Sequence, residues 1–284
     1  MKKLLKKFLI MTLIFTLAFT GVIPAYADTA AEPAADASQT ESYNYYFGVP
    51  HAHTSWSDAL NTSTPADAYE HGKGVNLDYL FVTDHSNMFN GNEFGEYDAE
   101  KNEFAEKEGS EWTLTRQLAE AATTESFLAG RGFEMTSSAS NGGENYGHIN
   151  VYNTDTYVEA ASTMQKLSDF YDWLDRTDGA IAYFNHPNRP ESSFEYLNYV
   201  EKVDDNIQMI EVGNGSMGSN YLESEEYYYK ALDYGWHLAP TNGQDNHALN
   251  WGDADNLTAV IAEELTEEAF YEAMQARRVY STET

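Results

Sequence analysis

An aromatic run near residue 45 leads directly into two histidines that are separated by one residue. His51 and His53 end the segment YYFGVPHAH, and in an extended chain residues i and i+2 point to the same side. Both imidazoles can therefore face one point just beyond the end of a strand. Neutral imidazole is the commonest metal ligand in proteins, and zinc or a related divalent ion fits such a pair. A single pair of this kind is weak evidence, so the prediction depends on further ligands elsewhere.

Further histidines and carboxylates occupy comparable positions, beside apolar runs that are typical of strands. The chain has eight histidines, and six of them lie at or just past such runs. The six histidines and the accompanying carboxylates are His51, His53, His85, His148, His186, His247, Asp58, Asp84, Glu134 and Asp245. The other two are His71, in the last turn of an expected helix, and His237, at the start of an expected strand. We interpret both as structural or surface residues.

The candidate ligands offer nitrogen and oxygen atoms but no sulfur, because the sequence contains no cysteine. Such a set suits zinc, manganese or iron(II). It also exceeds the three or four protein ligands that one zinc ion needs. A cluster of two or three divalent ions explains the surplus, with a carboxylate such as Glu134 bridging them. The lack of cysteine also excludes disulfides and thiolate catalysis.

Alternating strands and helices are expected to bring these side chains together. Apolar runs predict strands at 43–49, 77–83, 133–136, 148–152, 180–184, 207–212, 237–241 and 257–262. Helices are predicted from Pro65 to Gly72 or Gly74, over 111–128, 164–174 and 223–234, and after Thr266. This alternation predicts a parallel α/β architecture whose ligands lie mostly at the carboxyl ends of strands, where (β/α) barrels place their chemistry. The polar, acidic stretch 87–110 is expected to be a long loop or a lid over the site.

The first 27 residues have the features of a secretion signal. Four lysines precede the apolar run 8–19, and Ala25-Tyr26-Ala27 forms a cleavage site of the small-x-small type. Residues 28–42 have almost nothing large and apolar to bury and are expected to form a disordered leader, followed by a single domain over 43–284. We therefore expect a secreted or envelope-associated protein, cleaved after about Ala27, with no transmembrane segment in the mature chain.

The composition is strongly acidic. The formal net charge is −30, and loss of the four signal lysines would make it more negative. Such a surface repels nucleic-acid phosphates at long range, so a nucleic acid polymer is not an expected partner. A small phosphoester substrate is still compatible, because bound metal ions reverse the local field. The hydrophobic fraction of 42% supports a sizeable core.

Taken in order, the motifs resemble those of the PHP domain (polymerase and histidinol phosphatase). They are His51-x-His53, Ser57-Asp58, Thr83-Asp84-His85, Phe133-Glu134, His148, Asn185-His186-Pro187 and Asp245-x-His247. The resemblance covers the chain from roughly Tyr43 to its end. It looks closest to an exported branch of metal-dependent phosphoesterases that also includes carbamate-hydrolysing members. It implies a distorted (β/α)7 barrel, similar to a TIM barrel, with a di- or trinuclear metal centre.

The resemblance also implies a ligand set for each ion. The first ion would be held by His51, His53, Glu134 and Asp245, the second by Glu134, His148 and His186, and the third by Asp58, His85 and His247. Several family members have histidine at the position of Asp58, and Asp84 would orient a neighbouring histidine. This chain departs from the family at Ala59, where glycine is usual. It also stops soon after 279–282, where related exported proteins continue, so a fragment or a minimal version is expected.

The activity that the resemblance implies is hydrolysis of a phosphomonoester or phosphodiester by metal-activated hydroxide. Asp245 or a histidine such as His247 would transfer the proton. Arg189 is a candidate phosphate clamp, with an ordinary surface arginine as the alternative. Two other functions stay open. The same centre can hydrolyse a carbamate, amide or carboxylic ester, or the protein can be a catalytically silent metal-binding surface module.

Overall fold

The computed structural model describes residues 42–60, 62–89, 95–137, 144–216 and 221–283, and Glu41–Thr284 form one compact unit. The expected signal at 1–27 and all but the last residue of the expected leader lie outside the described residues, so both stay predictions. Within the described ranges, no helix is both long enough and apolar enough to cross a membrane.

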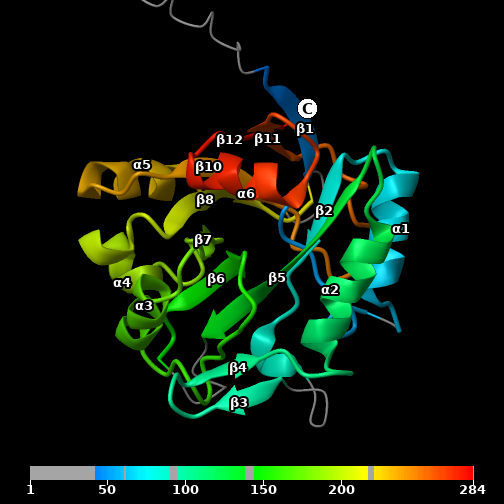
Figure 1. The fold of residues 1–284 in the computed structure, drawn as a ribbon. Helices are drawn as coiled ribbons and strands as arrows, with labels where there is room; N and C mark the ends of the chain where they lie inside the picture. Colours follow the sequence, from blue (N-terminus) through cyan, green and yellow to red (C-terminus); the bar gives the residue numbers. More distant parts are fainter. Residues whose placement is uncertain (1–41, 61, 90–94, 138–143, 217–220, 284) are drawn as a thin grey trace, which may run out of the picture. The chain divides into compact units, whose positions relative to one another are not determined.

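A curled, mixed sheet of ten strands forms the centre of the fold (Figure 1). Nine strands follow the path β10-β8-β7-β6-β5-β2-β1-β11-β12, and β9 pairs with β8. The strands are β1 (Asn44–Val49), β2 (Tyr79–Val82), β5 (Leu128–Ser137), β6 (Gly147–Tyr152), β7 (Ile181–Asn185), β8 (Ile207–Asn214), β9 (Leu222–Glu223), β10 (Ala239–Gly243), β11 (Thr258–Ala262) and β12 (Val279–Ser281). The curled sheet is consistent with a TIM-like barrel, whereas the sevenfold (β/α) count stays a prediction.

The expectation of a wholly parallel sheet is wrong. Strands β1, β2 and β5 run parallel, as do β7, β8 and β10, but β6 is antiparallel to both of its neighbours and β11 is antiparallel to β1. The segment between β5 and β6 is shorter than the dozen or so residues that a parallel crossover needs. As a result His148, at the start of β6, pairs with Thr136 near the end of β5 and lies at the same edge as Glu134.

Six α-helices surround the sheet, namely α1 (Pro65–Gly74), α2 (Glu111–Ala122), α3 (Leu167–Asp175), α4 (Ser193–Leu197), α5 (Glu225–Tyr234) and α6 (Glu267–Gln275), counted in the described ranges. In Figure 1, α1 and α2 lie at the right beside β2 and β5, whereas α3, α4 and α5 lie at the left. The predicted starts of α1 at Pro65 and of α6 after Thr266 are confirmed, with Thr64 and Thr266 as the N-cap residues. The backbone N–H of Thr64 donates to Asp67, and Thr266 Oγ1 accepts from the N–H of Ala269.

The segment from α2 to β5 differs from the expectation. Helix α2 ends at Ala122 rather than at Leu128, and Gly130 and Gly132, which fall between the predicted helix and the predicted strand, lie inside β5. A Cβ atom at Gly130 would lie 2.7 Å from Cγ of Phe81, and one at Gly132 would lie 2.6 Å from Cδ1 of Tyr152. The glycines therefore make room for aromatic rings on the concave face of the sheet. For this reason the strand is longer than the predicted 133–136.

The acidic stretch 87–110 is not simply a long loop. It contains the 3₁₀ turn η1 (Ser86–Met88) and a hairpin of β3 (Glu96–Asp98) and β4 (Glu103–Ala105). Phe104 exchanges backbone hydrogen bonds of 2.8 and 2.9 Å with Tyr157, and their rings stack with centroids 5.0 Å apart. The hairpin is thus fixed against the segment that follows β6. Residues 90–94 lie outside the described residues, and the role of a lid stays a prediction.

The concave face of the sheet is apolar at one end and polar at the other. Tyr79, Phe81 and Tyr183 are fully buried and pack in one cluster with Phe270 and Met274 of α6. This cluster fills the end at which the parallel strands begin, and α6 covers it. Towards the carboxyl ends of the parallel strands lie buried polar groups, among them Glu134, Asn185 and Glu211, and Asn185 donates a hydrogen bond to the buried Asn150 of the antiparallel β6. The polar end of the sheet is therefore the end at which a functional site is expected.

Candidate metal centre

Backbone hydrogen bonds between strand-end loops assemble the candidate ligands. The N–H of Asp245 donates to the carbonyl of His51 (3.0 Å), and the N–H of His53 donates to Asn246 (3.1 Å). The N–H of Glu134 donates to the carbonyl of Asp84 (3.1 Å), which places His85 beside Glu134. The loops after β1, β2 and β10 and the end of β5 therefore converge on one place.

The first group of ligand atoms comes from His51, His53 and Asp245. The Nε2 atoms of the two histidines lie 3.0 Å apart. Oδ1 of Asp245 lies 3.4 Å from Nε2 of His51 and 3.0 Å from Nε2 of His53. Both histidines are fully buried. One atom from each residue falls within 4.8 Å of the others, which suits coordination of a single ion.

Glu134 stands at the centre of the second group. Its Oε1 lies 3.2 Å from Nδ1 of His148 and 3.5 Å from Nε2 of His186, while its Oε2 lies 2.6 Å from Nδ1 of His85. His51 and His53 also approach within 3.5 and 3.4 Å. One buried carboxylate is thus surrounded by five imidazoles, as expected for a bridging ligand.

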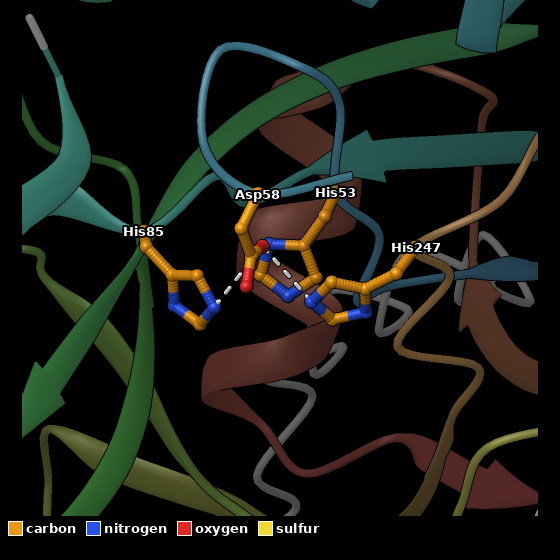
Figure 2. A group of neighbouring side chains, drawn as sticks. All are labelled: His53, Asp58, His85 and His247. Atoms are coloured by element: carbon orange, nitrogen blue, oxygen red, sulfur yellow. Dashed lines mark ion pairs between the residues drawn. The ribbon is translucent and has the colours of Figure 1, made fainter. Parts of the chain in front are cut away.

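The third group is shown in Figure 2, where Asp58 lies between His85 and His247. Its Oδ1 is 3.5 Å from Nε2 of His85 and 3.0 Å from Nε2 of His247. The ring of His53 lies 4.4 Å from the rings of both histidines, so this group adjoins the first. Asp58 is 39% exposed, which makes this the most open part of the cluster.

The charges in the cluster depend strongly on one another. Burial lowers the pKa of His85, but the charges of Glu134 and Asp58 outweigh burial and raise it to about 10. Burial together with the charge of His85 lowers the pKa of His53 to about 3. Burial raises the pKa of Glu134, but the surrounding histidines hold it well below its usual range. Glu134 is therefore ionised and His53 neutral, which are the forms that bind metal ions.

The residues present fit divalent metal ions. Two buried atoms, Nδ1 of His186 and Oε2 of Glu134, have no hydrogen-bond partner within the described part of the chain, although Oε2 lies close to imidazoles. Buried polar atoms without partners are costly unless another group satisfies them. Nitrogen and oxygen donors at these spacings suit zinc, manganese or iron. The number and identity of the ions stay a prediction.

The structure brings all nine predicted ligands together, and it adds two residues to which the sequence assigned no role. Glu211 Oε1 lies 2.7 Å from Nδ1 of His51, and its Oε2 accepts the backbone N–H of His186 (2.6 Å). Asn185 Nδ2 donates to Oε1 of Glu134 (2.7 Å). The position of Glu211 inside the apolar strand 207–212 could have indicated such a role, because a buried carboxylate needs polar partners.

The predicted roles of Asp84 and Arg189 rest on less direct geometry. Asp84 has no direct hydrogen bond to a histidine in the part of the chain described; it accepts hydrogen bonds from Thr54 and from Ser57 Oγ (2.6 Å). Ser57 Oγ lies 3.4 Å from Nδ1 of His53, so Asp84 acts on that imidazole through the serine.

The side chain of Arg189 is exposed, and among the described residues no hydrogen bond or ion pair joins it to the cluster. Its role stays a prediction.

Comparison with known proteins supports the fold. No family model and no curated protein matches the sequence. A two-domain protein from Bacteroides vulgatus, described as containing a predicted PHP-like metal-dependent phosphoesterase, superposes with a TM-score of 0.57 at 21% identity, over 85% of this chain and 65% of its own. This chain thus spans less than two thirds of that protein. PsfC from Pseudomonas syringae gives a TM-score of 0.55 at 16% identity, over 85% of this chain and 92% of its own.

The class of fold follows from these two structures. The chain shares its fold with the protein described as containing a predicted PHP-like metal-dependent phosphoesterase, and three groups of its candidate ligands lie close enough together to hold metal ions. Endonuclease Q, solved with a DNA duplex that carries an abasic lesion, gives a TM-score of only 0.42 at 11% identity. That likeness is too low to bear on the substrate.

Proposed function

We propose that this protein is a metal-dependent hydrolase that acts on phosphoric esters. The observation that carries the proposal is the overlap of the three ligand groups. His53 belongs to the first and third groups, His85 belongs to the second and third, and Glu134 reaches histidines of all three. Shared ligands between adjacent groups are typical of multinuclear hydrolytic centres rather than of single structural sites.

The residues of the cluster divide into buried and accessible ones. When bound, divalent ions would stabilise negative charge on phosphate oxygens and lower the pKa of water. Glu134 and His51 are buried and can hold ions but cannot reach a substrate. Asp245 and His247 are partly exposed, so they are placed to accept a proton from water or to return one to a leaving group. Arg189, whose N–H donates to the carbonyl of His186, would bind a substrate phosphate.

The proposal also covers the substrate and the location. A small phosphomonoester or phosphodiester fits better than a nucleic acid polymer, because the net charge of −30 repels a polyanion. The secretion signal inferred from residues 1–27 supports export and a place outside the cell or in its envelope.

The test begins with metal content. Mature protein purified without chelator should retain two or three equivalents of zinc, manganese or iron per chain. Glu134→Gln should lose most of this metal, because it removes the charge that reaches five imidazoles. His237→Gln is the matched control, since His237 pairs with Asp204 outside the cluster. Folded wild-type protein that binds less than half an equivalent, even with added metal, would refute the proposal.

Turnover then identifies the bond that is cleaved. Bis(p-nitrophenyl) phosphate, p-nitrophenyl phosphate and an aryl carbamate would be compared with the metal-loaded protein. We expect hydrolysis of at least one phosphate ester, and its loss in Glu134→Gln. Turnover of the carbamate alone would assign the centre to carbonyl substrates. Full metal occupancy without turnover of any ester, amide or carbamate would instead favour a silent binding module.

A further inference from the structure

A cavity of about 790 Å³ lies at the opposite end of the sheet from the metal centre. It is lined by Leu128 and Ala129 at the start of β5, by residues just after β6 and just before β7, and by the start of α6. Glu134 lies six positions beyond Leu128 in the same strand, which is roughly 20 Å at about 3.3 Å per residue. A ligand in this cavity would therefore not touch the metal centre. The volume is within the usual range for small-molecule sites.

Charged residues of both signs line the cavity. Lys101, Arg116 and Arg131 do so, together with four of the 46 acidic residues of the sequence. The acidic residues that line it, Glu120, Asp155, Asp178 and Glu267, are exposed. Among the charged residues that line the cavity, Arg131 is buried, Arg116 is partly exposed, and Lys101 is exposed like the acids.

Two guanidinium groups converge at one place in the wall. Nη2 of Arg131 and Nη2 of Arg116 both donate to the carbonyl of Thr154, over 2.9 and 3.4 Å. Arg131 is buried and held rigidly, because its guanidinium lies 3.5 Å from the centre of the Trp112 ring. Two adjacent, preorganised guanidinium groups match the oxygens of a carboxylate or a phosphate.

Two carboxylates balance the charge of this pair, and one of them is exposed. Both arginines share a single oxygen of Glu106, at 2.8 Å from Arg116 and 2.9 Å from Arg131. Burial, followed by the charge of Arg116, lowers the pKa of Arg131 to about 10. Burial also lowers the pKa of Arg116, but the hydrogen bond to Asp155 and the charge of Glu106 outweigh it and raise that pKa. The second charge is met by Asp155, whose side chain is 84% exposed. Exposed ion pairs contribute about 0–1 kcal/mol, so an anion can displace this carboxylate.

We propose that this cavity is a second binding site, for a small organic molecule whose carboxylate or phosphate group binds Arg116 and Arg131. Its body lies against Leu128 and Leu265. The site is independent of the metal centre and of the hydrolytic activity.

The test uses inorganic phosphate and succinate, titrated into the full metal-loaded protein by calorimetry. At least one of them should bind, and Arg116→Gln should weaken that binding by at least about tenfold, as expected for loss of a charge-assisted contact. Asp155→Asn should have the opposite effect and tighten binding, because it removes the carboxylate that competes with the ligand. A purely structural arginine pair does not predict this gain.

Matched controls separate the cavity from general electrostatics and from the metal centre. Asp172→Asn makes the same change of charge at an exposed residue that pairs with Lys202, and it should leave the affinity unchanged. Binding that survives Arg116→Gln, or that is lost only in Glu134→Gln, would place the anion elsewhere and overturn the proposal. Failure of both anions to bind wild-type and Asp155→Asn protein would overturn it as well.

Discussion

The carboxylate of Glu211 lies 2.7 Å from Nδ1 of His51, on the side of the imidazole that faces away from the candidate ligands. Burial lowers the pKa of His51, but the charges of Asp245, Glu211 and Glu134 outweigh it and raise that pKa well above its usual range. In the neutral imidazole that a metal ion requires, the contact with Glu211 favours the proton on Nδ1 and leaves Nε2, which faces His53 and Asp245, as the ligand atom. The other oxygen of Glu211 accepts the N–H of His186 and the amide of Asn214. One buried strand residue therefore orients two histidines from different loops.

Replacement of Glu211 by glutamine should impair the centre although the side chain keeps its size. The carboxylate accepts three N–H groups, whereas a carboxamide offers one acceptor oxygen and directs an NH₂ group at another donor. We expect a loss of about 10–100-fold in metal affinity or in kcat, as is typical when a carboxylate behind a ligating histidine is altered.

Equilibrium dialysis against zinc or manganese measures this effect, with circular dichroism as a check that the variant is folded. Glu223→Gln, an exposed residue of β9, is the matched control and should bind metal as the wild type does. An unchanged metal affinity in folded Glu211→Gln protein would show that His51 does not depend on this contact.

Asp58 should control one ion only. Its carboxylate belongs to the group of His53, His85 and His247 and to neither of the other two groups. Asp58→Ala should therefore lower the metal content by about one equivalent, and Asp58→His should restore it, because imidazole is a competent replacement ligand. Elemental analysis per folded chain gives the result, with the exposed Asp205→Ala as the control. Loss of all metal in Asp58→Ala would show that the groups do not fill separately.

Metal binding should release protons at neutral pH. The pKa of His85 is raised to about 10 in the metal-free protein, so its imidazole is protonated at pH 7, whereas a ligand must be neutral. His53, with a pKa lowered to about 3, and the ionised Glu134 contribute no proton. Protons therefore compete with the metal, and affinity should rise as the pH rises from 7 towards 10.

A dye-based proton count during metal titration in dilute buffer measures this release. Acidification that stops when the metal sites saturate is the expected result. His237→Gln, outside the cluster, should release the same number of protons. Saturation of the wild type without acidification would mean that His85 is neutral before the metal binds.

The structure brings the predicted ligand residues together because their signals are local. His51-x-His53 follows a strand, and the other candidate ligands lie beside apolar runs, so strand period and residue type were enough to select them; their division among ions came from the family resemblance and stays a prediction. The role of Glu211 was not predictable in this way, because it depends on which strands become neighbours, and residues 51, 186 and 211 are far apart in the sequence. The antiparallel direction of β6 follows from the short connection after β5, a local feature that the prediction of a parallel architecture did not use.

The glycines of β5 also depend on contacts between strands that local sequence patterns do not reveal. Local rules interpret Gly130-Arg131-Gly132 as a break, because glycine has low propensity for regular structure. Only the folded sheet reveals that the rings of Phe81 and Tyr152 occupy the space that side chains at these positions would need. The predicted strand 133–136 was therefore too short because packing between neighbouring strands, rather than local propensity, places these glycines in β5.

This packing makes Gly130 a test of the barrel interior. Gly130→Ala would place a methyl group 2.7 Å from Cγ of Phe81, in a cluster that α6 closes. Overpacking of this kind costs about 1–3 kcal/mol of the free energy of unfolding. Gly74→Ala, in the last turn of α1 with no atom within 4 Å of the added Cβ, should instead be neutral or stabilise by up to about 1 kcal/mol. Urea denaturation of the two variants measures both effects, and equal midpoints would contradict the tight contact between β5 and Phe81.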